Sequence, residues 1–286
     1  MAQKTLSIII PCWRLSRKPF WGHVLKSILE TKATEVILID NSPGDSVNRK
    51  LRLIPNVRVL NPGKNLGAAA SWNLGFKESS GDIVLFSADD ILLRPEPMRK
   101  AVALVSEEIP FVYGDYGIVQ YEDNTFQQIG ENKSRPFDKQ QLLEGIYLGY
   151  VSNYIDGASP MRRDVFPGFD VNLPRYIDWD MIARIVKAGY TGHYLSEKIF
   201  YTIEHPERSI TRDDNPPLEA LKRIRAKWKV HSTLSGKQKR EIEFIGTLLE
   251  LYQERAYLER AFPIVKEALR QLLVRLSRRA RPMRQP

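Results

Sequence analysis

Two adjacent carboxylates, Asp89 and Asp90, follow a short apolar run at residues 83–86 that is typical of a strand buried on both faces. Open α/β sheets bind their ligands where the strands end, so these side chains would lie at a binding edge. A carboxylate there could hold a divalent cation, Mg²⁺ or Mn²⁺, against a diphosphate. The alternative is that both side chains only cap the next segment, and the residues that precede the strand favour the cation.

A lysine and a run of small residues precede that strand. Lys64 comes just before residues 68–71, Ala-Ala-Ala-Ser, whose side chains are small enough to let a backbone approach a ligand closely. The positive end of the predicted helix and the Lys64 ammonium could both face a phosphate.

A second acidic pair, Asp178 and Asp180, opens a predicted helix that ends at Gly189. Apolar residues recur on one face of this helix at Met181, Ile182, Ile185 and Val186. Capping alone explains an aspartate at a helix N-terminus, so we expect one member of the pair to be structural.

The elements that must position these groups alternate along the chain. Strands at residues 6–10, 36–39 and 57–60, with a helix at 20–31, predict an α/β fold with a parallel, doubly wound sheet. Pro11 and Asp40 would then lie near each other at the carboxyl edge of this sheet. The alternative for Asp40 is that it starts a turn.

The middle of the chain predicts further elements. These are a helix from Pro95, strands at 111–113 and 117–121, a polar loop at 122–136, a short helix at 161–166 and a strand at 198–203. Three tyrosines, Tyr147, Tyr150 and Tyr154, could stack on a sugar, although packing in the core is the default explanation.

The motifs of the first half occur in a recognisable order: Asn65-x-Gly67, Asn73-x-Gly75, Gly81-Asp82, the apolar strand, and Ser87-Ala88-Asp89-Asp90. Together they resemble the nucleotide-sugar half of a family 2 glycosyltransferase with the GT-A fold, over roughly the first two thirds of the chain. That family usually has Asp-x-Asp after the strand. Ser87 stands at the first of these positions, so Asp89 alone matches the usual metal ligand.

The resemblance implies an inverting, metal-assisted enzyme of the hexosyltransferase type, active in polysaccharide biosynthesis. Its donor would be a UDP-, GDP- or dTDP-sugar, and its acceptor a hydroxyl group on a glycan or a lipid-linked glycan. The implied nucleotide and diphosphate ligands are Pro11, Asp40, Lys64, Asn65, Gly67, Ser87, Ala88, Arg208 and Arg212.

The resemblance also implies roles in metal binding and catalysis. Asp89 and His205 would hold Mg²⁺ or Mn²⁺, although a lone histidine is more often an ordinary hydrogen-bonded residue. Asp178 takes the place of the family's catalytic base, with Asp180 as the second choice, and Ile177 replaces the glutamate that usually precedes the base. A base is required because the acceptor hydroxyl must lose its proton as it attacks.

The composition changes near residue 214. We therefore predict a GT-A domain at 1–214, with a nucleotide-sugar half at 1–90 and an acceptor half at 91–214, and a basic amphipathic helical region at 215–286. Of the net charge of +9, the last 50 residues carry 12 Lys and Arg against 6 Asp and Glu, a net of +6. Such helices suit an anionic membrane surface, packing on the first domain, or pairing with a second copy of the chain.

Other features of the sequence bear on where the protein is located in the cell. No apolar run approaches the roughly 20 residues that span a bilayer. Cys12 is the single cysteine, and the N-terminus lacks the apolar core of a signal peptide, so we expect a cytoplasmic protein, peripheral at the inner face of a membrane if its basic helices bind lipid.

Three other functions compete with this one. A nucleotidyltransferase would carry a Gly-rich basic signature after the first strand, where this chain has Pro11-Cys12-Trp13-Arg14. A non-catalytic nucleotide-sugar-binding or scaffold protein would be consistent with Ser87. Nucleic-acid binding rests on the tail charge alone, because the chain contains no recognisable reading motif, and we predict no such partner.

Overall fold

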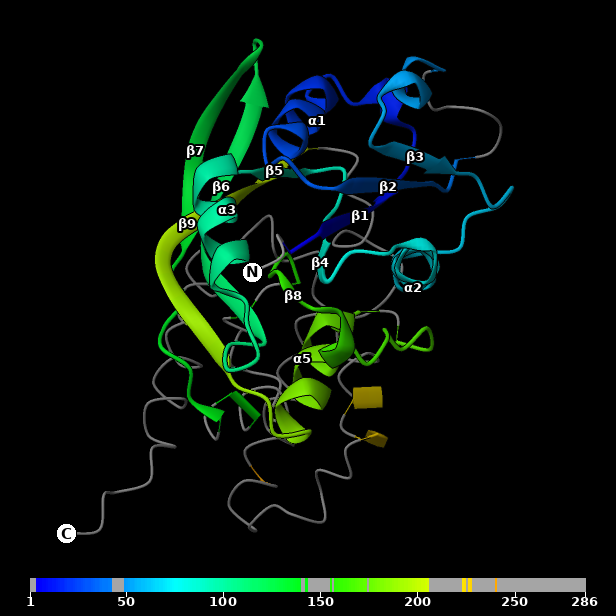
Figure 1. Cartoon of the computed structure of the whole chain (residues 1–286). Helices are drawn as coiled ribbons and strands as arrows, with labels where there is room; N and C mark the ends of the chain where they lie inside the picture. Colours follow the sequence, from blue (N-terminus) through cyan, green and yellow to red (C-terminus); the bar gives the residue numbers. More distant parts are fainter. Residues whose placement is uncertain are drawn as a thin grey trace, which may run out of the picture. The chain divides into compact units, whose positions relative to one another are not determined.

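The computed structural model describes residues 4–42, 49–139, 142–143, 155, 157–173, 175–205, 223–224, 226–227 and 240 (Figure 1). The chain divides into two compact units. The first unit comprises Met1–Lys139, Tyr154–Asn172 and Ile177–Arg212, and the second comprises Gln140–Asn153, Leu173–Tyr176 and Asp213–Pro286. Almost all described residues belong to the first unit, and the predicted domain boundaries stay a prediction.

Four parallel strands form the first half of the sheet in the first unit. They are β1 (Leu6–Cys12), β2 (Glu35–Asp40), β3 (Val57–Leu60) and β4 (Ile83–Phe86), in the spatial order β3-β2-β1-β4. All three neighbouring pairs are parallel, as the alternation of strands and helices predicts. The central strands β1 and β4 are largely apolar on both faces, and all of their residues except Pro11 are buried, because helices cover both sides of the sheet.

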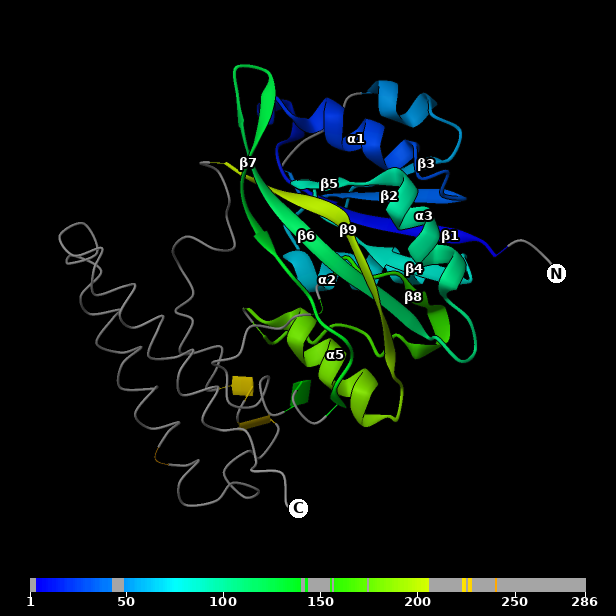
Figure 2. The ribbon, with the colours of Figure 1, turned by 90° about the vertical axis from the view of Figure 1, so that its left-hand side faces the viewer.

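The sheet continues beyond β4 in a mixed arrangement. Its further strands are β8 (Met161–Arg162), β6 (Phe111–Glu122), β9 (Gly192–Glu204) and β5 (Ile91–Leu93), with β7 (Thr125–Asn132) paired to β6. Strands β6 and β9 pair in parallel over most of their length, whereas β8, β5 and β7 join their neighbours antiparallel. Figure 2 shows β6 and β9 as long, twisted strands and the β6–β7 hairpin projecting beyond the rest of the sheet.

Helices lie on both faces of the parallel half. α1 (Trp21–Leu29) lies on one face and α2 (Ala68–Glu78) on the other (Figure 1), and α3 (Pro95–Leu104) packs against β9 and β6. α5 (Ile177–Lys187) follows later in the chain, and three short 3₁₀ turns are η1 (Leu15–Arg17), η2 (Arg49–Leu53) and η3 (Arg163–Val165). The predicted α/β class is therefore confirmed.

Several local predictions were wrong. The polar loop predicted at 122–136 contains β7, and the two strands predicted between 111 and 121 form one strand, β6. Asp123 and Asn124 make the hairpin turn with φ values of 48° and 61°, a left-handed conformation that Asp and Asn tolerate. The short helix predicted at 161–166 is instead strand β8 followed by η3.

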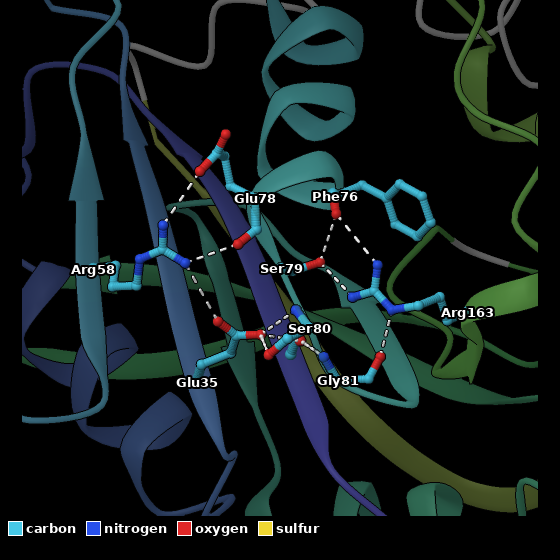
Figure 3. Close-up of polar contacts among 9 residues, drawn as sticks. Glu35, Arg58, Phe76, Glu78, Ser79, Ser80, Gly81 and Arg163 are labelled. Atoms are coloured by element: carbon cyan, nitrogen blue, oxygen red, sulfur yellow. Dashed lines mark hydrogen bonds and ion pairs between the residues drawn. The ribbon is translucent and has the colours of Figure 1, made fainter.

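A polar network joins the elements at the opposite end of the parallel strands (Figure 3). Arg163 donates through Nε to the Gly81 carbonyl at 2.6 Å and through Nη2 to Ser79 Oγ at 2.6 Å. Glu35 Oε1, at the start of β2, accepts from the Ser80 N–H at 2.6 Å. These bonds fix the start of β4 relative to β2, and the strands carry that alignment to their other ends.

Most of the predicted basic helical region at 215–286, and Tyr147, Tyr150 and Tyr154, lie outside the described residues. Within the described part of the chain, every helix is too short or too polar to cross a bilayer.

Candidate active site

The carboxyl ends of β1, β2 and β4 bring predicted site residues to one edge of the sheet. Cys12 is in register with Asp40 across β1 and β2, and the β4 chain continues into Ser87, Ala88 and Asp89. Pro11 is half-buried within β1, so this strand extends past the point where the sequence predicts that it ends. The parallel strands therefore gather Pro11, Asp40 and Asp89 as predicted.

Asp89 is buried and both of its oxygens accept hydrogen bonds. Lys18 Nζ lies 2.5 Å from Oδ1, and the Trp13 backbone N–H donates to Oδ2 at 2.9 Å. Burial raises the pKa of Asp89, Lys18 partly offsets that rise, and the neighbouring Asp90 adds to it. Neither Lys18 nor Trp13 is predicted as a site residue from the sequence, because both follow β1 in a segment that no periodic pattern marks.

Asp40 and its neighbour Asn41 connect the end of β2 to the start of α2. Asp40 is 1% exposed and its Oδ1 accepts from the Ser42 N–H at 3.0 Å, which is the turn-forming contact considered as its alternative role. Asn41 Nδ2 donates to Ser71 Oγ at 2.9 Å, and Asn41 Oδ1 accepts from the Leu66 N–H at 3.0 Å. Asn41 is a further site-building residue that the sequence did not single out.

The loop before α2 places Lys64, Asn65 and Gly67 at the surface. Asn65 Oδ1 accepts from the Gly67 N–H at 2.8 Å, and Gly67 has a φ of 75° at the N-terminal cap of the helix. The small residues that follow Gly67 form the first turn of α2, which begins at Ala68. Among the described residues Lys64 has no hydrogen-bond or ion-pair partner, so its predicted contact with a phosphate remains a prediction.

Ser87 and Ala88 lie between β4 and Asp89. Ser87 is buried, its N–H donates to the Ile9 carbonyl at 2.9 Å, and its carbonyl accepts from Trp72 Nε1 at 2.9 Å. Its Oγ has no hydrogen-bond partner among the described residues. Ala88 is half-buried, and its carbonyl accepts from the Ile91 N–H at 3.2 Å.

Asp90 faces a different partner from Asp89. His205 Nε2 is 3.7 Å from Asp90 Oδ2, and the His205 ring lies 5.1 Å from the ring of Phe20, measured between centroids. Of the two predicted metal ligands, Asp89 is thus paired with Lys18, and His205 lies beside Asp90. Within the described ranges no three His, Cys, Asp or Glu side chains are grouped as a metal site would require.

The two aspartates at the start of α5 differ in how deeply their side chains are buried. Asp180 is fully buried, and Arg184 Nε donates to its Oδ2 at 2.9 Å while Arg184 Nη1 donates to the Pro167 carbonyl at 2.9 Å. Asp178 is half-buried in the first turn, and its Cβ is 3.5 Å from the position that a Cβ on Gly157 would occupy. Arg208 and Arg212 lie outside the described residues.

Two bacterial proteins are similar to this chain. It is 31% identical over 188 residues to the uncharacterized glycosyltransferase YwdF of Bacillus subtilis, covering 64% of this chain and 68% of that protein. It is 26% identical over 232 residues to an uncharacterized glycosyltransferase of Haemophilus influenzae, covering 77% of this chain and 76% of that protein.

The fold is similar to that of S. aureus TarS. The structure of TarS residues 1–349 in complex with UDP-GlcNAc matches with a TM-score of 0.57 at 15% identity, over 94% of this chain and 79% of that chain. A second crystal structure of TarS residues 1–349 matches with a TM-score of 0.55 at 18% identity, over 83% of this chain and 69% of that chain. The mixed sheet is thus similar to GT-A glycosyltransferase structures.

Residues 7–168 match the sequence model of the family described as Glycosyl transferase family 2. This span includes β1 to β4 and the edge at which Asp40 and Asp89 lie. The chain belongs to glycosyl transferase family 2.

Proposed function

We propose that this protein transfers a sugar from a nucleoside-diphosphate sugar to a hydroxyl group of a glycan or lipid-linked glycan, with inversion at the anomeric carbon. The observation that carries the proposal is the buried cluster of Asp40, Asp89 and Lys18 at the carboxyl ends of parallel strands in a family 2 chain. The similarity of the fold to that of TarS, which has been crystallised in complex with UDP and with UDP-GlcNAc, supports a nucleotide-sugar donor.

The donor would lie along this edge. Asp40 would accept a hydrogen bond from the base or the ribose, because a buried carboxylate is a strong acceptor. The backbone of Pro11, Ser87 and Ala88 would line the nucleotide. The loop of Lys64, Asn65 and Gly67 would face the diphosphate, where the N-terminus of α2 adds partial positive charge. Arg208 and Arg212 would neutralise the leaving group.

The predicted cation, Mg²⁺ or Mn²⁺, does not fit the residues as they are arranged. Both oxygens of Asp89 accept from protein donors, one of them an ammonium at 2.5 Å, and His205 faces Asp90 instead. An ion at Asp89 would have to displace Lys18. Metal assistance therefore stays a prediction from the family resemblance, and the proposed mechanism routes no step through it.

Asp178 is the proposed base. As the acceptor oxygen attacks the anomeric carbon from the face opposite the diphosphate, the Asp178 carboxylate would take the hydroxyl proton and the sugar–phosphate bond would break. The burial of Asp180 supports this choice. Its carboxylate pairs with Arg184 in the interior, so a structural role explains Asp180 and leaves Asp178 as the candidate base.

The experiment combines a nucleotide screen with two variants of the full chain. Thermal-shift and sugar-release assays with UDP-, GDP- and dTDP-sugars should identify one donor base. Asp178→Asn should lower kcat by about 10²-fold to 10⁴-fold without changing donor affinity, as expected for a lost general base. Asp123→Asn, in the exposed hairpin turn, is the matched control and should leave kcat unchanged.

The outcomes separate the alternatives. Full activity in Asp178→Asn would transfer the base role to another residue, with Asp180 as the next to test. Nucleotide binding without turnover by the wild type would favour the non-catalytic binding protein. The partner of region 215–286, a membrane surface or a second copy of the chain, and the cytoplasmic location stay predictions.

A further inference from the structure

The Lys18–Asp89 ion pair is unusual in its burial. The two side chains are 8% and 11% exposed, and their charged atoms are 2.5 Å apart. Removing both charges from water costs free energy that their attraction roughly repays, so a buried ion pair is a poor device for stability alone. The pair also lies at the edge of the sheet where ligands bind, between the end of β1 and the end of β4.

The geometry leaves the ammonium able to bind more than Asp89. An ammonium group has three N–H donors, and among the described residues Asp89 is its one hydrogen-bond acceptor. The other Asp89 oxygen accepts from the Trp13 backbone N–H at 2.9 Å, so a second donor helps to orient the carboxylate. The ion pair thus places a positive charge beside the Asp89 carboxylate at the donor edge.

We propose that Lys18 is the resident cation of the donor site, held by Asp89 and donating hydrogen bonds to the donor's diphosphate, so that nucleotide binding needs no divalent ion. The inference rests on the proposed function and deepens it. Ser87 is consistent with this arrangement, because it removes one of the two carboxylates that a metal would use in the family pattern. Without a metal, Asp89 and Asp90 would repel a diphosphate, and the single positive charge of Lys18 reduces that repulsion.

Titration calorimetry on the full chain tests the proposal. The ligands are UDP, GDP and dTDP, each in EDTA and in MnCl₂, with the corresponding nucleosides as ligands that lack the diphosphate. In the wild type, EDTA should change the Kd of the bound nucleoside diphosphate by less than about twofold, because the protein carries its own cation.

Lysine variants test the residue itself. Lys18→Met should raise the Kd for the nucleoside diphosphate in EDTA by about tenfold or more, the effect of losing a charge-assisted hydrogen bond. The nucleoside should bind as before, and Lys18→Arg, which keeps the charge, should retain most of the affinity. Lys26→Met is the matched control, since that side chain is 75% exposed on α1.

A folding control accompanies these variants. Lys18→Met leaves the Asp89 charge buried without its cation, so the melting temperature of each variant is measured. The double variant Lys18→Met/Asp89→Asn removes that charge and should recover the melting temperature while still binding the nucleoside diphosphate weakly.

Three results would overturn the inference while leaving the proposed function intact. They are wild-type binding that EDTA abolishes and Mn²⁺ restores, a Lys18→Met variant that binds the diphosphate normally, and one that loses the nucleoside and the diphosphate equally. If the wild type binds none of the nucleotides, the proposed function itself fails.

Discussion

Asp89 and Asp90 are neighbours in sequence, yet one is paired with Lys18 and the other faces His205. The sequence pattern identifies these two carboxylates because they follow an apolar run that is typical of a buried strand. They do not identify the partners, because Lys18 is 71 residues away from Asp89 along the chain. At the scale of single residues, then, the chemistry of the site depends on contacts between distant segments.

Cys12 illustrates how burial suppresses reactivity at the same edge. Burial raises its pKa well above the ordinary value, and the charges of Asp89 and Asp40 raise it further. We expect iodoacetamide at pH 8 to label Cys12 only after unfolding, because the thiolate is the reactive form. Mass spectrometry of the native and the urea-unfolded chain measures this, and rapid labelling of the native protein would contradict the assigned burial.

At the scale of elements, α2 positions the donor loop by packing closely on the sheet. A Cβ on Gly75 would lie 2.3 Å from Ile9 Cγ2 and 2.8 Å from Ile39 Cδ1, so only glycine allows this approach without movement. The helix α2, which follows the loop of Lys64 and Gly67, can therefore pack this closely on β1 and β2 because Gly75 has no side chain.

Gly75→Ala should destabilise the protein by about 1–3 kcal/mol, because overpacking outweighs the better helix propensity of alanine. Gly22→Ala on α1 is the matched control. Nothing lies within 4 Å of the position that a Cβ on Gly22 would occupy, so that substitution should stabilise by about 0.5–1 kcal/mol. Urea unfolding of both variants measures the difference, and equal effects would refute the close packing of α2.

At the scale of the whole first unit, the polar network of Figure 3 couples stability to pH. Burial alone would raise the pKa of Glu35, but hydrogen bonds from Ser80 and Ser7 outweigh it and lower that pKa below its ordinary value of 4.5. The folded state therefore holds the Glu35 proton less tightly than the unfolded state. This stabilisation is present above the unfolded pKa and is lost as the pH falls through the folded pKa.

Glu35→Gln should lower the free energy of unfolding at pH 7 by about 1 kcal/mol, a modest value for a partly exposed group. The difference from wild type should shrink as the pH falls below 4.5 toward 3, measured by urea unfolding at several pH values. Glu108→Gln, at an exposed position, is the control. A gap that is constant with pH would show that the Glu35 charge is not responsible.

The sequence by itself determined the parallel half of the first unit. Strands β3 and β4 have the predicted limits, and the predicted run of small residues forms the start of α2, because apolar runs, small residues and glycine act locally. The same locality identified Asp40, Asp89 and Asp178 as candidates. Their roles stay proposals, but their places at strand and helix ends follow from patterns a few residues long.

Only the tertiary structure decided the rest. β5 and β7 are short or polar strands whose pairing with β9 and β6 provides the hydrogen bonds that their own sequences do not signal. Likewise, the tertiary structure placed Lys18 on Asp89 and buried Asp180 against Arg184. The physical reason is that a side chain's charge partner and burial depend on which distant segments the fold brings together, and no local pattern records that choice.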